Sequence, residues 1–339
     1  MVNIFFLRIN SAFRLLVFMM LFLGCYIEVV ADELCAPLPD ELSLRYGSYE
    51  QFQARNQQGR QISWSRVGAS NQRIVFYAHG NPGSRFEALF FHDYALSAGI
   101  TLYVLERPGF GCSDYKAEYS LSDYAEDTKW LYQRLGLNQP VSLMGWSSGG
   151  PPSLAVASYY PALVRRVVVA SSYSNFGEMP SAKALMKQYH RPGPLLSDKT
   201  PRLFHGLISM VGWASHKLPN VYFKVTEQEV SLSDRTILEQ PGVKALFLLN
   251  QEEAFAQGAH GAIQDLTTQW QPWPFGLRDV SSQVLLVQGG EDKLVPKEFV
   301  FHMAQAIPGA QLEFLSSEGH LYPLSKEYQK VLLGWLIED

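Results

Sequence analysis

The feature that most constrains this chain is a serine between glycines at a predicted strand-to-helix turn. Residues 145–149 read Gly-Trp-Ser-Ser-Gly, after the apolar segment 141–144 and before the helix-compatible segment 153–157. A strand, a tight turn and a helix in this order strain the serine backbone, and flanking glycines let the strand and helix approach. The pattern predicts that Ser147 projects from the carboxyl end of a strand. A glycine-rich turn whose serine has no catalytic role can show the same pattern by chance. Other residues must therefore decide whether Ser147 is a nucleophile.

Two loops further along the chain carry groups that could activate this serine. A serine hydroxyl is a weak nucleophile and needs a base, which in turn needs an orienting group. The predicted strand 284–287 runs into a loop with Asp292, and the predicted strand 311–315 runs into a loop with His320. Ser147, Asp292 and His320 are therefore the predicted nucleophile, acid and base.

Each assignment has competitors. Glu291 is adjacent to Asp292, and Asp265 is a more distant alternative acid. Seven of the eight histidines are interpreted as structural: His79 in a turn, His92 and His302 in helix-compatible stretches, and His190, His205, His216 and His260 in the segment before the acid-bearing strand.

An early turn can stabilise negative charge on an attacked carbonyl. The predicted strand 73–78 ends in His79-Gly80-Asn81. We expect one backbone N–H of an oxyanion hole at Asn81 and the other at Ser148, which follows the nucleophile. Asn81 and Trp146 are also candidates to line the substrate pocket.

Together these motifs resemble an α/β-hydrolase-fold protein with a serine nucleophile. The resemblance runs from about residue 60 to the C-terminus and rests on five motifs: His79-Gly80-Asn81-Pro82-Gly83, Arg107 to Ser113, Gly145 to Gly150, Gly289 to Asp292, and Gly319-His320. It implies an α/β fold, in which a mostly parallel central sheet is flanked by helices and carries an inserted, mainly helical cap. It does not identify the substrate.

The type of nucleophile indicates which reaction the site could catalyse. The turn at residues 79–82 resembles that of haloalkane dehalogenases and epoxide hydrolases, which attack with an aspartate. Ser147 with a histidine base suits acyl transfer at a carbonyl instead. Arg107 and Asp114 are interpreted as loop-fixing groups.

The chain divides into four segments. We predict a signal peptide at 1–31, the first part of the hydrolase core at 32–172 with an irregular start to about 58, a helical cap at 173–274, and the second part of the core at 275–339. Much of the apolar surface of the cap is expected to pack it onto the core, and part of it is expected to line the pocket. The apolar side chains of the cap are Leu203, Phe204, Leu207, Ile208, Met210, Val211, Trp213, Val221, Tyr222, Phe223, Phe247, Leu248, Leu249 and Phe255.

The N-terminus predicts export. Arg8 and Arg14 accompany an uncharged apolar run at 15–27, which is short for a membrane span, and small residues allow cleavage after Ala31. The expected location is periplasmic or secreted. The alternatives are a lipoprotein processed at Cys25 and an uncleaved anchor that associates the protein with a membrane.

Composition excludes several partners. The net charge is −4 with scattered basic residues, so no nucleic-acid footprint is expected. We expect no metal and no cofactor, because metal-ligand spacings and phosphate-binding glycine loops are missing from the sequence. Cys35 and Cys112 are expected to be separate free thiols, with a disulfide between them as the alternative that an oxidising compartment permits.

The resulting prediction is a serine hydrolase that cleaves a carboxylic ester, thioester or amide through an acyl-enzyme. Few charged residues occupy the strand-end loops, so an uncharged or lipid-like ester is the expected substrate. The alternatives are an acyltransferase, a proline iminopeptidase-like peptidase and a non-catalytic ligand binder on the same fold.

Overall fold

Eight strands form one mostly parallel sheet in the computed structural model, which describes residues 37–70 and 73–338. The sheet order is β1-β2-β4-β3-β5-β6-β7-β8. Strands β1, β2 and β4 pair antiparallel, and all other neighbours pair parallel. The strands are β1 (Glu50–Arg55), β2 (Gln61–Gly68), β3 (Arg73–Ala78), β4 (Ile100–Leu105), β5 (Val141–Trp146), β6 (Val164–Ala170), β7 (Gln283–Gly289) and β8 (Gln311–Leu315). This confirms the predicted α/β fold class.

The central strands are apolar because both faces of the sheet are covered. On β6, Val167 and Val169 belong to one apolar cluster and Val168 to the other, as the two-residue period of a strand requires. Helices α3 and α14 contribute to one cluster, and α4, α5 and α13 contribute to the other. These helices are α3 (His92–Ser97), α4 (Leu121–Arg134), α5 (Gly150–Tyr159), α13 (Glu298–Ala306) and α14 (Lys326–Ile337).

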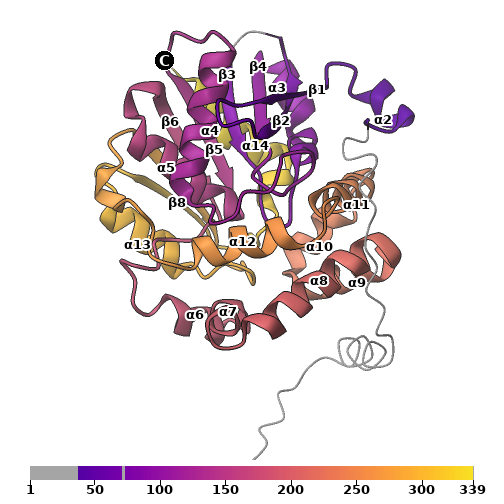
Figure 1. The fold of residues 1–339 in the computed structure, drawn as a ribbon, viewed down its shortest axis with the longest axis vertical. Helices are drawn as coiled ribbons and strands as arrows, with labels where there is room; N and C mark the ends of the chain where they lie inside the picture. The colour runs from indigo at the N-terminus through magenta and orange to yellow at the C-terminus, as the bar shows by residue number, and fades with distance from the viewer. Residues whose placement is uncertain (1–36, 71–72, 339) are drawn as a thin grey trace, which may run out of the picture. The chain divides into compact units, whose positions relative to one another are not determined.

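A run of helices occupies the chain between β6 and β7. It lies along the lower edge of the sheet in Figure 1. We call residues 182–269 the inserted segment; it comprises α6 (Ala182–Gln188), α7 (Gly193–Lys199), α8 (Pro201–Lys217), α9 (Pro219–Glu229), α10 (Leu232–Leu238), α11 (Val243–Ala254) and α12 (His260–Gln269). Within the described ranges, no helix is both long enough and apolar enough to cross a bilayer.

Three apolar side chains of the inserted segment face solvent. Leu203, Trp213 and Val221 are 53%, 42% and 47% exposed, whereas Phe204 and Phe255 are buried. The expectation concerned much of this apolar surface and not all of it, so these three exposed residues do not contradict it. Helix α8 packs through the face that carries Phe204, which turns Leu203 and Trp213 to solvent.

The expected irregular start is also wrong from residue 40. Helix α2 (Asp40–Arg45) forms there, and β1 pairs antiparallel with β2 from Glu50↔Arg66 to Arg55↔Gln61. Because β1 is a solvent-exposed edge strand, its polar sequence hides the strand pattern. The predicted signal peptide, Cys25 and Cys35 lie outside the described residues.

Candidate active site

Ser147 occupies a strained turn between β5 and α5. Its φ is +55°, in the left-handed region that a residue with a Cβ seldom adopts. A Cβ on Gly149 would lie 1.9 Å from Ala78 O, and one on Gly145 would lie 2.2 Å from Gly149 O. The two glycines thus permit the close approach of strand and helix that keeps Ser147 in this conformation.

His320 and Asp292 meet at the ends of neighbouring strands. Strand β7 leads to Asp292 and β8 leads to His320, and His320 Nδ1 lies 2.8 Å from Asp292 Oδ2. Asp292 Oδ1 accepts hydrogen bonds from the amides of Leu294 (2.8 Å) and Val295 (2.9 Å). A carboxylate on Nδ1 favours the tautomer with the proton on that nitrogen and leaves Nε2 as an acceptor.

The backbone of His320 is held by the inserted segment. Asp234 on α10 is fully buried, and its carboxylate accepts from the amides of His320 (3.0 Å) and Leu321 (2.6 Å). On the other side, Trp146 donates its indole N–H to His320 O at 3.1 Å, and the two rings lie 5.7 Å apart. Trp146 directly precedes Ser147, so the histidine loop is tied to the elbow.

The charges around His320 favour its protonated form. Burial alone lowers the pKa of His320, but Asp292 and, more weakly, Asp234 raise it, and the net pKa lies above the ordinary 6.5. Both carboxylates therefore stabilise the imidazolium that forms when the histidine takes a proton.

Ser147 and His320 are not hydrogen-bonded in this structure. Across residues 73–338, the Ser147 hydroxyl makes no hydrogen bond to His320, although Trp146 contacts that histidine. Serine–histidine contacts are often long without substrate and tighten when it binds. The elbow contacts the His320–Asp292 pair through Trp146.

The turn after β3 is fixed by buried polar groups. Arg107 donates to His79 O (2.6 Å) and Gly80 O (2.9 Å), and His79 Nε2 accepts from the Arg107 amide. Glu87 Oε1 accepts from the Gly80 amide at 2.8 Å. Asp265 on α12 pairs with Arg107 at 2.8 Å, so this helix also holds the turn.

The amides predicted to form the oxyanion hole are those of Asn81 and Ser148. Neither donates a backbone hydrogen bond to any residue in the described ranges. The carbonyl of Ser148 accepts from Gln269 Nε2 of α12 at 2.9 Å, which fixes this peptide from the other side.

The amide nitrogen of Asn81, one of the two predicted pocket residues, is held by the inserted segment. This nitrogen donates to Ala262 O (3.0 Å) and to Asp265 Oδ2 (2.7 Å), both on α12. Trp146, the other pocket candidate, is buried against His320. Of the competing acids, Glu291 is exposed and Asp265 is paired with Arg107.

Several residues that shape this site were missed from the sequence: Glu87, Asp234, Asp265 as an anchor, and Gln269. Of these residues, only Asp234 belongs to a recognisable short sequence pattern. Ser231 and Asp234 form a capping box at the start of α10, which the Ser-x-x-Asp spacing could have indicated.

A buried acidic cluster does not suit a metal. Glu106, Cys112 and Glu253 offer ligand atoms within 4.8 Å of one another. However, Arg85 forms ion pairs with both carboxylates, and Cys112 is disulfide-bonded. The arginine supplies the positive charge that a cation would bring, and a disulfide sulfur is not a thiolate ligand. The expectation of a free thiol is therefore wrong for Cys112.

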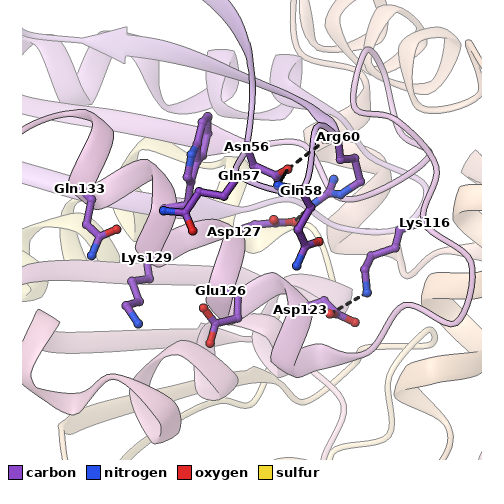
Figure 2. A pocket seen from close by; sticks show the side chains of 11 residues that line it. Asn56, Gln57, Gln58, Arg60, Lys116, Asp123, Glu126, Asp127, Lys129 and Gln133 are labelled. Carbon is purple, nitrogen blue, oxygen red and sulfur yellow. Dashed lines mark hydrogen bonds and ion pairs between the residues drawn. The ribbon is translucent and has the colours of Figure 1, made fainter.

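Two cavities lie near the described loops. A polar cavity of about 270 Å³ between residues 56–60 and α4 is shown in Figure 2. Its charges are largely paired internally, as by Lys116 with Asp123 at 2.7 Å, and no predicted catalytic residue lines it. A second cavity of about 360 Å³ is lined by Asp292, Tyr189 and Arg191, so the acid borders an opening toward the inserted segment.

Comparison with known proteins assigns the class. The model of the alpha/beta hydrolase family matches residues 75–332. The uncharacterized hydrolase YcgS of Bacillus subtilis (strain 168) is 24% identical over 288 residues, covering 82% of this chain and 95% of that protein. The 2-(acetamidomethylene)succinate hydrolase of Mesorhizobium japonicum is 27% identical over 229 residues, covering 67% and 73%.

Solved structures agree on the fold. The esterase EaEST from Exiguobacterium antarcticum superposes with a TM-score of 0.61 at 19% identity, covering 84% of this chain and 99% of that one. This chain belongs to the alpha/beta hydrolase family, and its relatives support a hydrolase.

Proposed function

We propose that this protein is a serine hydrolase that cleaves a carboxylic ester through an acyl-enzyme, with Ser147 as nucleophile, His320 as base and Asp292 as acid. The observation that carries the proposal is the 2.8 Å contact between His320 Nδ1 and Asp292 Oδ2 beside a serine held at φ +55°. A histidine oriented by a carboxylate is what a serine hydroxyl needs to become a nucleophile.

In the proposed reaction, Ser147 Oγ attacks the ester carbonyl carbon while His320 Nε2 takes the hydroxyl proton. The amides of Asn81 and Ser148 stabilise the oxyanion. His320 then gives its proton to the leaving alcohol as the carbon–oxygen bond breaks. Water, deprotonated by His320, attacks the acyl-serine and releases the carboxylic acid.

We propose an uncharged or lipid-like ester as substrate. Arg107, the cation beside the turn, already donates to two carbonyls and is paired with Asp265, so its charge is balanced within the protein. An apolar cluster lies between the inserted segment and the core and includes Phe110, Phe176, Phe204, Phe255, Trp270 and Phe299. Such side chains suit an acyl or alkyl group.

Two assays test this proposal. A fluorophosphonate should label the wild type and a Ser153→Ala control, but not Ser147→Ala. On p-nitrophenyl esters, kcat/KM should rise from acetyl to butyryl to hexanoyl, because each buried methylene contributes about 0.8 kcal/mol, or about four-fold. Labelling of Ser147→Ala would refute Ser147 as the nucleophile. A higher kcat/KM for the acetyl ester than for the butyryl and hexanoyl esters would refute a lipid-like substrate.

An amide substrate has one observation in its favour. The relative from Mesorhizobium japonicum is named for an acetamido compound, and acetamides therefore belong in the panel. Acyl transfer to an added alcohol in competition with water separates a transferase from a hydrolase. Cleavage of aminoacyl amides without ester cleavage would favour a peptidase.

We also propose export with cleavage after Ala31, on the strength of the sequence at 1–31. N-terminal sequencing of the protein from its cell should give a start at Asp32. A lipid-bearing start at Cys25 would favour a lipoprotein, and an intact Met1 would favour an anchor.

A further inference from the structure

Helix α8 presents a line of apolar residues to solvent. Leu203 and Trp213 are 53% and 42% exposed, Met210 is half-buried, and a Cβ built on Gly206 would meet open space. Positions 203, 206, 210 and 213 are spaced by three and four residues, so they share one face of the helix. We call these four residues the α8 stripe.

The stripe does not hold the helix in place. Phe204, Gly212, Ala214 and Ser215 are the buried residues of α8. A surface helix normally carries polar side chains opposite its buried face. The apolar α8 stripe therefore has no packing role that explains it.

Positively charged residues flank the stripe along the sequence. From Lys199 to Thr226 the chain has no acidic residue, although its overall net charge is −4. Within the part of the chain that the structure describes, the four cations of this stretch are exposed and form no ion pair; they are Lys199, Arg202, Lys217 and Lys224. Lys217 continues the stripe one turn beyond Trp213, and Arg202 adjoins Leu203.

We propose that the α8 stripe and these four cations dock on the surface of an anionic lipid bilayer, with α8 lying in the interface. Leucine, methionine and tryptophan side chains suit the boundary between headgroups and acyl chains, and lysine and arginine suit the lipid phosphates. This inference is independent of the chemistry proposed for Ser147.

Charge complementarity favours an anionic lipid bilayer over a second copy of the chain and over the apolar N-terminal run. A symmetric contact with a second copy would place the four cations of one copy against those of the other. The apolar N-terminal run of this chain carries Arg8 and Arg14 and no acidic residue before Glu28, so it offers no opposite charge. An anionic headgroup layer supplies that charge.

Vesicle flotation of the full chain tests the cations. Phosphatidylcholine vesicles are compared with vesicles that also contain phosphatidylglycerol. Each cation near an anionic surface contributes about five-fold to binding, so Arg202→Gln/Lys217→Gln should bind the anionic vesicles about 25-fold more weakly. The matched control Lys326→Gln/Lys330→Gln removes two exposed cations of α14 and should bind like the wild type.

The apolar part of the proposal has a matched pair of variants. Leu203→Ser should weaken binding about ten-fold, whereas Leu96→Ser, at a residue 51% exposed on α3, should not. Brominated lipid should quench the Trp213 emission, obtained as the difference between wild type and Trp213→Phe. This signal reports α8 even if the N-terminus anchors the protein.

Three results would overturn the proposal: variants that bind like the wild type, Trp213 emission that brominated lipid leaves unchanged, and a lipid-free dimer that Leu203→Ser dissociates. The last result would assign the stripe to a second copy. Circular dichroism of each variant excludes unfolding as the cause of lost binding.

Discussion

A buried carboxyl beneath the turn after β3 makes a prediction about stability that is separate from catalysis. Glu87 is 4% exposed and accepts hydrogen bonds from Tyr77 OH (2.6 Å) and the Gly80 amide (2.8 Å). Burial raises the pKa of Glu87 to about 7, although its hydrogen bonds and Arg107 lower it. The folded protein therefore holds a proton here that the unfolded chain releases at lower pH.

The sign and size of the effect follow from this difference. The unfolded carboxyl has an ordinary pKa of 4.5. The folded state binds the proton more tightly than the unfolded chain. The contribution of Glu87 to the free energy of unfolding is therefore fully present below pH 4.5 and is lost as the pH rises toward 7. The total loss is at most about 3 kcal/mol, at 1.36 kcal/mol for each pKa unit. Glu87→Gln keeps an acceptor for Tyr77 and Gly80 and cannot ionise, so it should escape this loss.

Urea unfolding at several pH values between 5 and 8 measures the effect. Glu87→Gln should match the wild type near pH 5 and exceed it by up to about 3 kcal/mol at pH 8. Glu291→Gln, at an exposed carboxylate, is the control and should show no such trend. A Glu87→Gln variant that is less stable than the wild type at pH 8, or a difference independent of pH, would refute the reasoning.

Three further predictions concern the proposed triad. His320→Ala should reduce kcat by several orders of magnitude, as much as Ser147→Ala, and Asp292→Asn somewhat less; a larger loss in Glu291→Gln would reassign the acid. The kcat/KM of the wild type should fall as the pH drops below the pKa of His320, which lies above 6.5. Asp292→Asn should move this fall in kcat/KM to lower pH, because the Asp292 carboxylate raises the pKa of His320; an unchanged pH dependence would contradict the pairing of the two residues. Asp234→Asn should lower kcat about 10- to 100-fold with little change in KM, because an asparagine amide has only one oxygen and cannot accept from both loop N–H groups. A KM raised by the same factor at unchanged kcat would instead assign Asp234 to substrate binding.

Local patterns in the sequence were sufficient for the core of the fold. Buried parallel strands read as short apolar runs, and loops at their carboxyl ends carry the reactive groups. For this reason β3, β5, β7, β8 and the loops with Asp292 and His320 could be predicted. Strand β1 could not, because an exposed edge strand has no apolar face.

Contacts between distant segments could not be predicted from one sequence. Asp234 is 86 residues from His320, and Asn81 is 184 residues from Asp265. No periodicity or spacing links residues so far apart. The exposed face of α8 was hidden for a related reason, because apolar composition alone does not show which side of a helix is buried.

The same distant contacts argue that the inserted segment is a fixed part of the site rather than a lid that lifts away. Asp234 holds the amide of His320, Asp265 pairs with Arg107, and Gln269 holds the turn after Ser147. Separating the Arg107 pair alone would leave two buried charges uncompensated, which costs about 3–5 kcal/mol, and each lost buried hydrogen bond costs about 1–3 kcal/mol more. A total above about 5 kcal/mol would leave fewer than about one molecule in several thousand open. Substrate should therefore reach the serine through movements of side chains and short loops, while α10 and α12 stay in place.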